Sequence, residues 1–82
     1  MVKSIPTKFK VARIKAGLYQ RDLAQQVGIT SNALSQIETG HKSTTGKTAS
    51  AICSVLGVHF DEIFIIEQGG GNDGNMREAF GV

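Results

Sequence analysis

The sequence predicts a single all-α domain of five short helices, and three observations lead to this fold class. Apolar residues recur at helical spacing in five segments, and no segment alternates apolar and polar residues as a half-buried strand does. Short connections containing glycine or polar residues join the segments. The chain has 82 residues, which is the size of one domain with a modest core.

The first helix is expected to open within residues 4–7 and to run to about Ala16. Pro6 suits a first helical turn because its missing N–H is not needed there, and Ser4 or Thr7 is expected to cap the helix. The apolar residues of its inner face are Phe9, Ala12 and Ala16. The lysines of its outer face, which we interpret as a solvated surface, are Lys8, Lys10 and Lys15.

Residues 20–40 contain two more amphipathic segments that meet at a glycine. Helices are expected over 20–27 and 30–39, with Gly28 supplying the backbone freedom of a tight corner. Tyr19 stands where a capping residue is usual, so the first of these helices is expected to have a weak cap. The outer face of the second carries small polar side chains, namely Ser31, Asn32, Ser35 and Gln36. Two short helices joined in this way form a helix-turn-helix.

The remaining chain predicts two further helices and a tail. A polar loop over 41–47 leads to a helix over 48–56, and a short helix follows over 58–64. The inward residues of the fourth helix are expected to be Ile52, Leu56 and either Val55 or Cys53. Residues 1–67 are therefore interpreted as the folded domain, and the Gly-rich residues 68–82 as a flexible C-terminal tail.

Composition excludes several classes of protein. The chain has no run of about eighteen apolar residues, so no membrane span is expected. Its single cysteine cannot form an internal disulfide, which fits a reducing cytoplasm. Residues 1–66 hold eight Lys or Arg and four Asp or Glu, a balance of +4, whereas residues 67–82 hold one and three, a balance of −2. A basic body with an acidic end is compatible with phosphate binding.

Motifs of other chemistries fail on their spacing. The run GHKSTTGKT ends like a phosphate-binding loop, but five residues separate Gly40 from Gly46 where that motif has four, and no strand precedes it. His41 and His59 lie far apart without clustered Cys or carboxylate partners, so no metal site is expected. No nucleophile, base and orienting group occur together, so no catalytic site, cofactor or small-molecule substrate is expected. Cys53 is interpreted as a small core residue.

Residues in and around the two central helices carry a resemblance to a known family. These residues are Arg13, Gly17-Leu18, Gln20, Leu23-Ala24, Val27-Gly28-Ile29, Leu34-Ser35-Gln36-Ile37-Glu38, Gly40, Ile52, Leu56-Gly57-Val58 and Asp61-Glu62-Ile63-Phe64. In this order and spacing, residues 9–64 resemble the helix-turn-helix family of phage repressors and Cro proteins. The resemblance implies a five-helix lambda-repressor-like domain whose third helix reads the DNA major groove.

The resemblance also assigns roles to single residues. It implies base-edge contacts from Ser31, Asn32 and Gln36, and a phosphate contact from Gln20. It implies that Thr39 and the loop after Gly40 touch the DNA backbone, and that an Arg13–Glu38 ion pair ties the first helix to the third.

Side-chain chemistry supports these roles independently. The amides of Asn32 and Gln36 can each bond adenine through two atoms, whereas the hydroxyls of Ser31 and Ser35 specify less. The third helix has no arginine for guanine, so readout is expected to favour A·T pairs. The side chains suited to phosphate are Gln20, Thr30, Thr39, His41, Lys42 and Lys47. In an arbitrary helix, Asn32 and Gln36 would be interpreted as ordinary solvent-exposed residues.

An apolar run ends the predicted domain. Phe60 and residues 64–66 belong either to the core or to a dimer surface. In our hypothesis Phe64, Ile65 and Ile66 pack across a two-fold axis, which would set two recognition helices about 34 Å apart on a palindromic operator.

The sequence thus predicts a cytoplasmic, sequence-specific regulator of transcription that binds double-stranded DNA. A homodimeric repressor is the favoured form, without enzymatic activity or membrane association. The alternative is an antitoxin-like or adaptor module of the same fold whose main partner is another protein.

Overall fold

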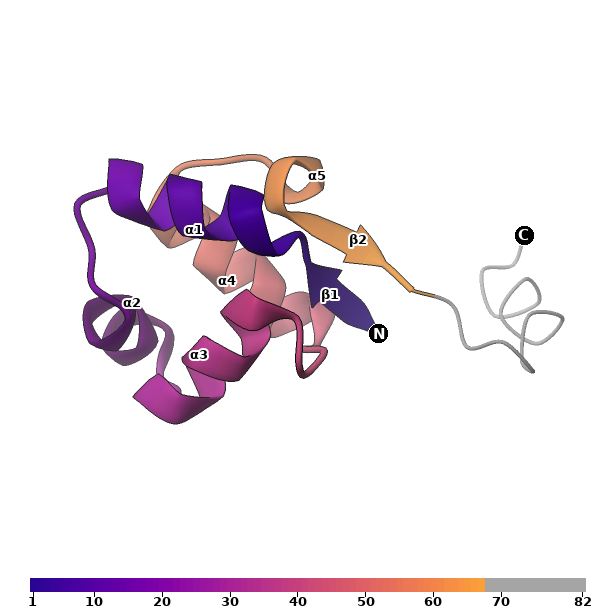
Figure 1. The fold of residues 1–82 in the computed structure, drawn as a ribbon, viewed down its shortest axis with the longest axis horizontal. Coiled ribbons are helices and arrows are strands. Elements are labelled where there is room, and N and C mark those ends of the chain that lie inside the picture. The colour runs from indigo at the N-terminus through magenta and orange to yellow at the C-terminus, as the bar shows by residue number, and fades with distance from the viewer. Residues whose placement is uncertain (68–82) are drawn as a thin grey trace, which may run out of the picture.

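The computed structural model describes residues 1–67, and the predicted tail over 68–82 lies outside the described residues. Seven elements follow one another along the chain (Figure 1). They are β1 (Val2–Ser4), α1 (Pro6–Lys15), α2 (Gln20–Val27), α3 (Ser31–Thr39), α4 (Gly46–Leu56), α5 (Phe60–Ile63) and β2 (Phe64–Ile66). The five predicted helices are therefore present, and the longest of them has 11 residues. No helix within residues 1–67 has both the length and the apolar character needed to cross a bilayer.

Two short strands correct the expectation that the described domain is purely helical. β1 and β2 form an antiparallel pair in which Val2 lies opposite Ile66 and Ser4 opposite Phe64. On its other side β1 exchanges two backbone hydrogen bonds with Thr44, from the Val2 N–H (3.0 Å) and to the Val2 carbonyl (2.7 Å). Each strand has three residues, which is too short for an alternating pattern to be visible in the sequence.

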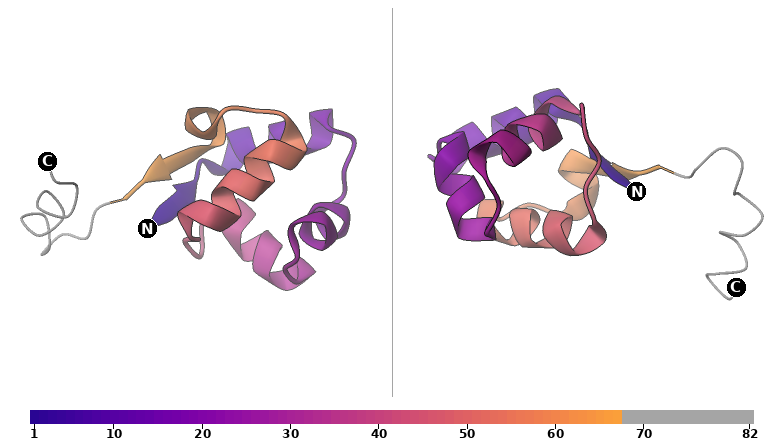
Figure 2. Two further views of the ribbon diagram at one scale, coloured as in Figure 1. Left: turned by 180° about the vertical axis from the view of Figure 1, so that it is seen from behind. Right: turned by 90° about the horizontal axis from the view of Figure 1, so that it is seen from below.

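The helices enclose one core. Figure 1 shows α1 and α5 along one side and α2 and α3 along the other, with α4 behind them, and the reverse view in Figure 2 brings α4 to the front. The largest fully buried side chains come from every helix and from β2, and are Phe9, Phe64, Leu23, Leu34, Ile52 and Ile63. The Phe9 and Phe64 rings meet edge to face with their centroids 5.7 Å apart. Cys53 is buried and Val55 half-buried, so the fourth helix turns the cysteine inward.

Helix ends differ from the predictions where capping groups were missed. α4 begins two residues early, at Gly46, because the Thr45 hydroxyl accepts a hydrogen bond from the Thr48 N–H (3.2 Å). α5 is shorter than predicted and spans four residues.

The N-terminal ends of α1 and α2 also differ from the predictions. Neither Ser4 nor Thr7 caps α1, since Ile5 is its N-cap residue and makes no side-chain cap hydrogen bond. At the start of α2 the Asp22 carboxylate accepts a hydrogen bond from the Tyr19 N–H (3.0 Å), so this end is capped without a Ser or Thr.

Candidate nucleic-acid interface

The corner between α2 and α3 is built by a glycine and a threonine. Gly28 ends α2 at φ +89°, a left-handed conformation that suits glycine. The Thr30 hydroxyl then accepts a hydrogen bond from the Ala33 N–H (3.0 Å) and caps α3. Leu34 and Ile37 are buried on the inner side of α3, which fixes the rotation of the helix about its axis and turns its polar residues outward.

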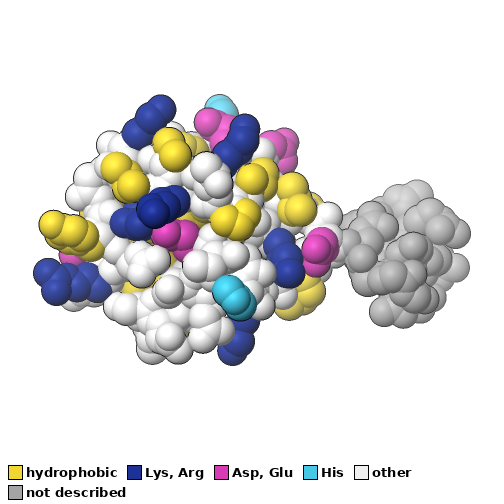
Figure 3. Space-filling model, in the orientation of Figure 1, with side chains coloured by type: hydrophobic (Ala, Val, Ile, Leu, Met, Phe, Trp, Pro, Cys, Tyr) yellow, Lys and Arg dark blue, Asp and Glu magenta, His cyan; other side chains and the backbone are white. Residues whose placement is uncertain are grey.

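The predicted base-reading residues lie together on the outer side of α3. Ser31 and Asn32 are exposed, while Ser35 and Gln36 are half-buried. Figure 3 shows this surface as mainly uncharged, with basic side chains around it. A groove of about 340 Å³ runs between α3 and the loop that follows it. It is lined by Thr30, Asn32, Ala33, Gln36, Ile37, Lys42 and Ser43. The structure thus brings both amides together with one of the predicted phosphate-binding lysines.

Hydrogen bonds order the polar groups at the end of α3. The Thr39 hydroxyl lies 3.0 Å from the Ser35 carbonyl and 3.2 Å from the Gln36 carbonyl, so it donates back into its own helix. His41 Nδ1 lies 2.8 Å from the same hydroxyl. The hydroxyl proton is directed to the helix, so the hydroxyl oxygen can accept a hydrogen bond from His41 if the imidazole carries its proton on Nδ1. In that tautomer Nε2 is left for other contacts.

A second groove of about 380 Å³ lies on the other side of α3, between α1 and the start of α2. Two predicted phosphate-binding residues, Gln20 and Thr39, line it together with Thr7 and Lys10 of α1. The sequence interpretation left Lys10 on a solvated face, because helical periodicity shows that a lysine points outward but not which neighbouring helix it approaches. Lys47 is exposed in the first turn of α4, outside both grooves.

An arginine near α3 was also missed. Arg21 is the second residue of α2, and its guanidinium carbon lies 5.8 Å from the centroid of the exposed Tyr19 ring. This distance is that of a cation–π contact. Both side chains line a hollow of about 560 Å³ that reaches Ser31 at the start of α3. The sequence carries a signal for Arg21 only in its position, at the exposed N-terminal turn of the helix before α3.

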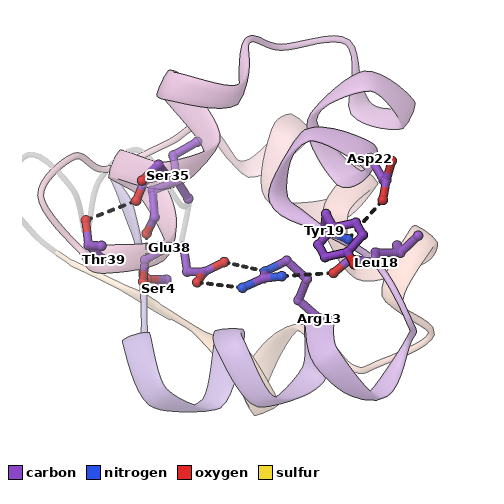
Figure 4. Close-up of polar contacts among 9 residues, drawn as sticks. Ser4, Arg13, Leu18, Tyr19, Asp22, Ser35, Glu38 and Thr39 are labelled. Atoms are coloured by element: carbon purple, nitrogen blue, oxygen red, sulfur yellow. Dashed lines mark hydrogen bonds and ion pairs between the residues drawn. The ribbon is translucent and has the colours of Figure 1, made fainter.

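A buried ion pair ties this surface to α1 (Figure 4). Arg13 Nε donates to Glu38 Oε1 at 2.7 Å, and its Nη2 donates to Oε2 at 3.2 Å. The third guanidinium nitrogen, Nη1, donates to the Leu18 carbonyl at 2.8 Å. Ser4 extends the network by donating to the Ile37 carbonyl at 2.6 Å. The expected Arg13–Glu38 pair is thus present, and the strand residue Ser4 supports α3 instead of capping α1.

The residues of the predicted dimer surface lie away from α3. Phe64 is 1% exposed, so its side chain packs in the core of the domain. Ile65 and Ile66 are exposed.

Burial raises the pKa of the Cys53 thiol above its ordinary value, and the nearby Glu62 carboxylate raises it further. Among residues 1–67, no three His, Cys, Asp or Glu side chains lie close enough together to hold a metal ion.

Comparison with known proteins agrees with this geometry. A helix-turn-helix family model matches residues 9–63. A protein of Methanothermobacter thermautotrophicus, named an uncharacterized HTH-type transcriptional regulator, is 34% identical over 65 residues, which cover 78% of this chain and 94% of that protein. The chain therefore belongs to the helix-turn-helix family of the Cro and cI type.

Proposed function

We propose that the protein is a DNA-binding regulator of transcription that reads the major groove with α3. The observation that carries the proposal is the single groove in which Asn32, Gln36 and Lys42 meet. Amides for base edges and a cation for phosphate are the side chains that a reading helix needs at adjacent positions. The name of the Methanothermobacter relative, an HTH-type transcriptional regulator, supports the same function.

Base readout rests on the amides of Asn32 and Gln36, each of which can bond adenine N6 and N7. Ser31 and Ser35 add contacts that discriminate less between bases. Since α3 contains no arginine, the preferred site is expected to be rich in A·T pairs at the positions that α3 touches.

Phosphate contacts flank the reading groove. On one side they come from Thr30, His41 and Lys42, and Lys47 extends them into α4. On the other side Gln20 and Thr39 share their groove with Lys10, and we add Lys10 to the contacts proposed from sequence. Arg21 lines a third hollow together with Ser31 and is proposed as a further cation that contacts the DNA backbone. Positive charge on both sides of α3 would hold the helix in register.

The regulator is further proposed to act as a homodimeric repressor on a palindromic operator. A single domain contributes one short reading helix, and two copies related by a two-fold axis would double the sequence read. Occupation of the operator would block transcription sterically, and this activity needs no cofactor.

The test begins with selection of bound duplexes from a random pool, followed by titrations of the preferred site and its single-base variants. Gln36→Ala should lose about 1–3 kcal/mol on the preferred site and relax specificity at one position. Lys10→Ala should weaken binding to all DNA sequences alike, and it should reduce the slope of the logarithm of the binding constant against the logarithm of salt concentration by about 1. Gln25→Ala, which makes the same chemical change on the exposed part of α2, is the matched control.

Two outcomes would count against this proposal. If Gln36→Ala discriminates among sequences as the parent protein does, Gln36 does not read bases. If the parent protein binds all duplexes alike, the adaptor function becomes the better explanation of the fold.

A further inference from the structure

A groove between α1 and α5 lies apart from the proposed DNA-binding surface. Its volume is about 350 Å³, and none of the residues proposed to contact DNA lines it. Figure 3 shows several apolar side chains over α1, with basic side chains among them. The apolar residues that line the groove come from α1, from the turn between α4 and α5, and from α5, and are Val11, Ala12, Val58 and Ile63.

This apolar lining is only partly covered by the rest of the domain. Val11 is 44% exposed, and Ala12 and Val58 are half-buried, whereas Ile63 is buried. A single exposed valine needs no explanation. Apolar residues from three segments of the chain that meet in one concave surface are, by contrast, typical of a binding site. The groove therefore has room for an apolar side chain that residues 1–67 do not supply.

The free charges at the groove are basic. Lys8 and Lys15 both line it and both are exposed. Within residues 1–67 neither lysine forms an ion pair. The third charged residue of the lining is Glu62, whose carboxylate accepts a hydrogen bond from the His59 N–H (2.7 Å) at the start of α5. The groove is thus complementary to an apolar segment that also carries an acidic side chain.

The sequence after Glu67 contains a segment of this composition. Residues 76–80 read MREAF, in which Met76, Ala79 and Phe80 are apolar and Glu78 is acidic. The three apolar residues have the spacing i, i+3 and i+4, which allows their side chains to share one surface. Residues 68–82 as a whole hold two acidic residues and one arginine, a balance of −1, opposite in sign to the two lysines of the groove.

The intervening chain is long enough to return to the groove. Ile63 precedes Glu67 by four residues, which limits the distance from Glu67 back to Ile63 to about 14 Å. Four of the eight residues over 68–75 are glycine. A Gly-rich chain of this length has a root-mean-square end-to-end distance of about 14–17 Å. So short a connection gives an effective concentration on the order of millimolar, so contacts too weak to hold a separate peptide are sufficient.

We propose that residues 76–80 dock in the groove between α1 and α5 of their own chain. In this arrangement Phe80 fills the apolar part of the groove beside Val11, and Glu78 lies toward Lys8 and Lys15. The interaction uses no residue assigned to DNA contact. It therefore goes beyond the proposed function, and it holds whether or not α3 reads DNA.

The experiment attaches a nitroxide spin label beside the docked segment of the full-length protein. Gly81→Cys supplies the attachment site, and burial shields Cys53 from the reagent. Docking should broaden the amide NMR signals of the groove residues Val11 and Lys15 more than the signal of Glu67. Glu67 is the described residue nearest to the label along the chain, so a label that is not held at the groove would broaden Glu67 most.

Substitutions in the spin-labelled protein test the contacts. Val11→Lys and Phe80→Ser should each remove the broadening at Lys15, because one places a charge in the apolar part of the groove and the other removes the ring that fills it. Ile14→Lys is the matched control for the first, since Ile14 is 58% exposed on α1 and does not line the groove. Val82→Ser, outside the docked segment, is the control for the second. Both controls should keep the broadening, and circular dichroism establishes that each variant is folded.

A mixed sample distinguishes a chain's own segment from that of another copy. One protein is isotope-labelled for NMR without a spin label, and the other carries the spin label without the isotope. The groove signals of the isotope-labelled protein should stay sharp in the mixture. Broadening there equal to that within one chain would show docking between copies and would overturn the proposal as stated. Broadening that is strongest at Glu67, or that persists at Lys15 in both Val11→Lys and Phe80→Ser, would overturn it as well.

Discussion

Replacement of Arg13 by methionine should severely destabilise the domain. Methionine keeps the unbranched stem of arginine and removes the guanidinium with its charge and hydrogen bonds. The Glu38 carboxylate, in a residue that is 4% exposed, would lose both guanidinium contacts, and the Leu18 carbonyl would lose its donor. A carboxylate left buried without its partner is the costly product of this substitution.

The magnitude follows from the burial of the pair. Both side chains are largely inaccessible to water, at 10% and 6%, so solvent screens their interaction weakly. Removal of one partner of such a pair costs about 3–5 kcal/mol. A domain of this size has a free energy of unfolding of about 4–12 kcal/mol, so the loss is a large share of its stability. The melting temperature should fall by about 12–40 °C.

Urea denaturation followed by circular dichroism measures the effect. The double variant Arg13→Met/Glu38→Leu removes both charges and should regain most of the loss, since apolar replacement of a whole buried pair is often neutral. Lys8→Met, on the exposed face of the same helix, should change the free energy of unfolding by less than about 0.5 kcal/mol. If Arg13→Met lowers the free energy of unfolding by less than about 1 kcal/mol, or if the double variant is no more stable than the single one, the Arg13–Glu38 ion pair does not stabilise the fold.

Two further substitutions test the backbone and the core. Gly28→Ala should destabilise the domain by about 1–2 kcal/mol because Gly28 adopts φ +89°. Gly46→Ala, in α4 with open space at its Cβ, should be neutral or should stabilise the domain by about 0.4–1 kcal/mol. If both substitutions lowered the denaturant midpoint to the same extent, the backbone conformation of Gly28 would not be the cause. The raised pKa of Cys53 means that the folded state holds the thiol proton more tightly than the unfolded chain. Its contribution to stability is therefore complete below the unfolded pKa of about 8.5 and declines as pH rises toward the folded pKa. Urea titrations between pH 7 and 10 should show this decline in the parent protein and a weaker one in Cys53→Ala, and equal slopes would exclude the thiol as its cause.

Sequence patterns predicted the helical part of the fold because its signals are local. Leu34 and Ile37 recur at helical spacing, and Gly28 and Gly40 follow helices whose ends need a left-handed residue. The strands escaped prediction because their pairing partners are 64 residues apart, from Val2 to Ile66, and each strand is too short for periodicity. Phe64 was placed partly at a surface for the same reason, since its burial depends on contact with Phe9 from the other end of the domain.

The polar surface shows the same division between local and long-range information. Helical spacing was sufficient to set Asn32 and Gln36 on one side of α3. The approach of Lys10 to Gln20 depends on how α1 crosses α2, and a pattern within one helix carries no information about that crossing.

The junction of β1 with β2 has a consequence for how the domain folds. By bringing Val2 to Ile66, it closes the described chain into a ring that contains every helix. Closure of a loop of about sixty residues costs about 3.6 kcal/mol of chain entropy, which two three-residue strands cannot offset alone. The strands are therefore stable only after the helices have brought the two ends together. The pairing of the two strands is then a late event in folding. If the strands separate early in unfolding, Ser4 would lose its position against α3 and Thr44 would lose its backbone hydrogen bonds with Val2.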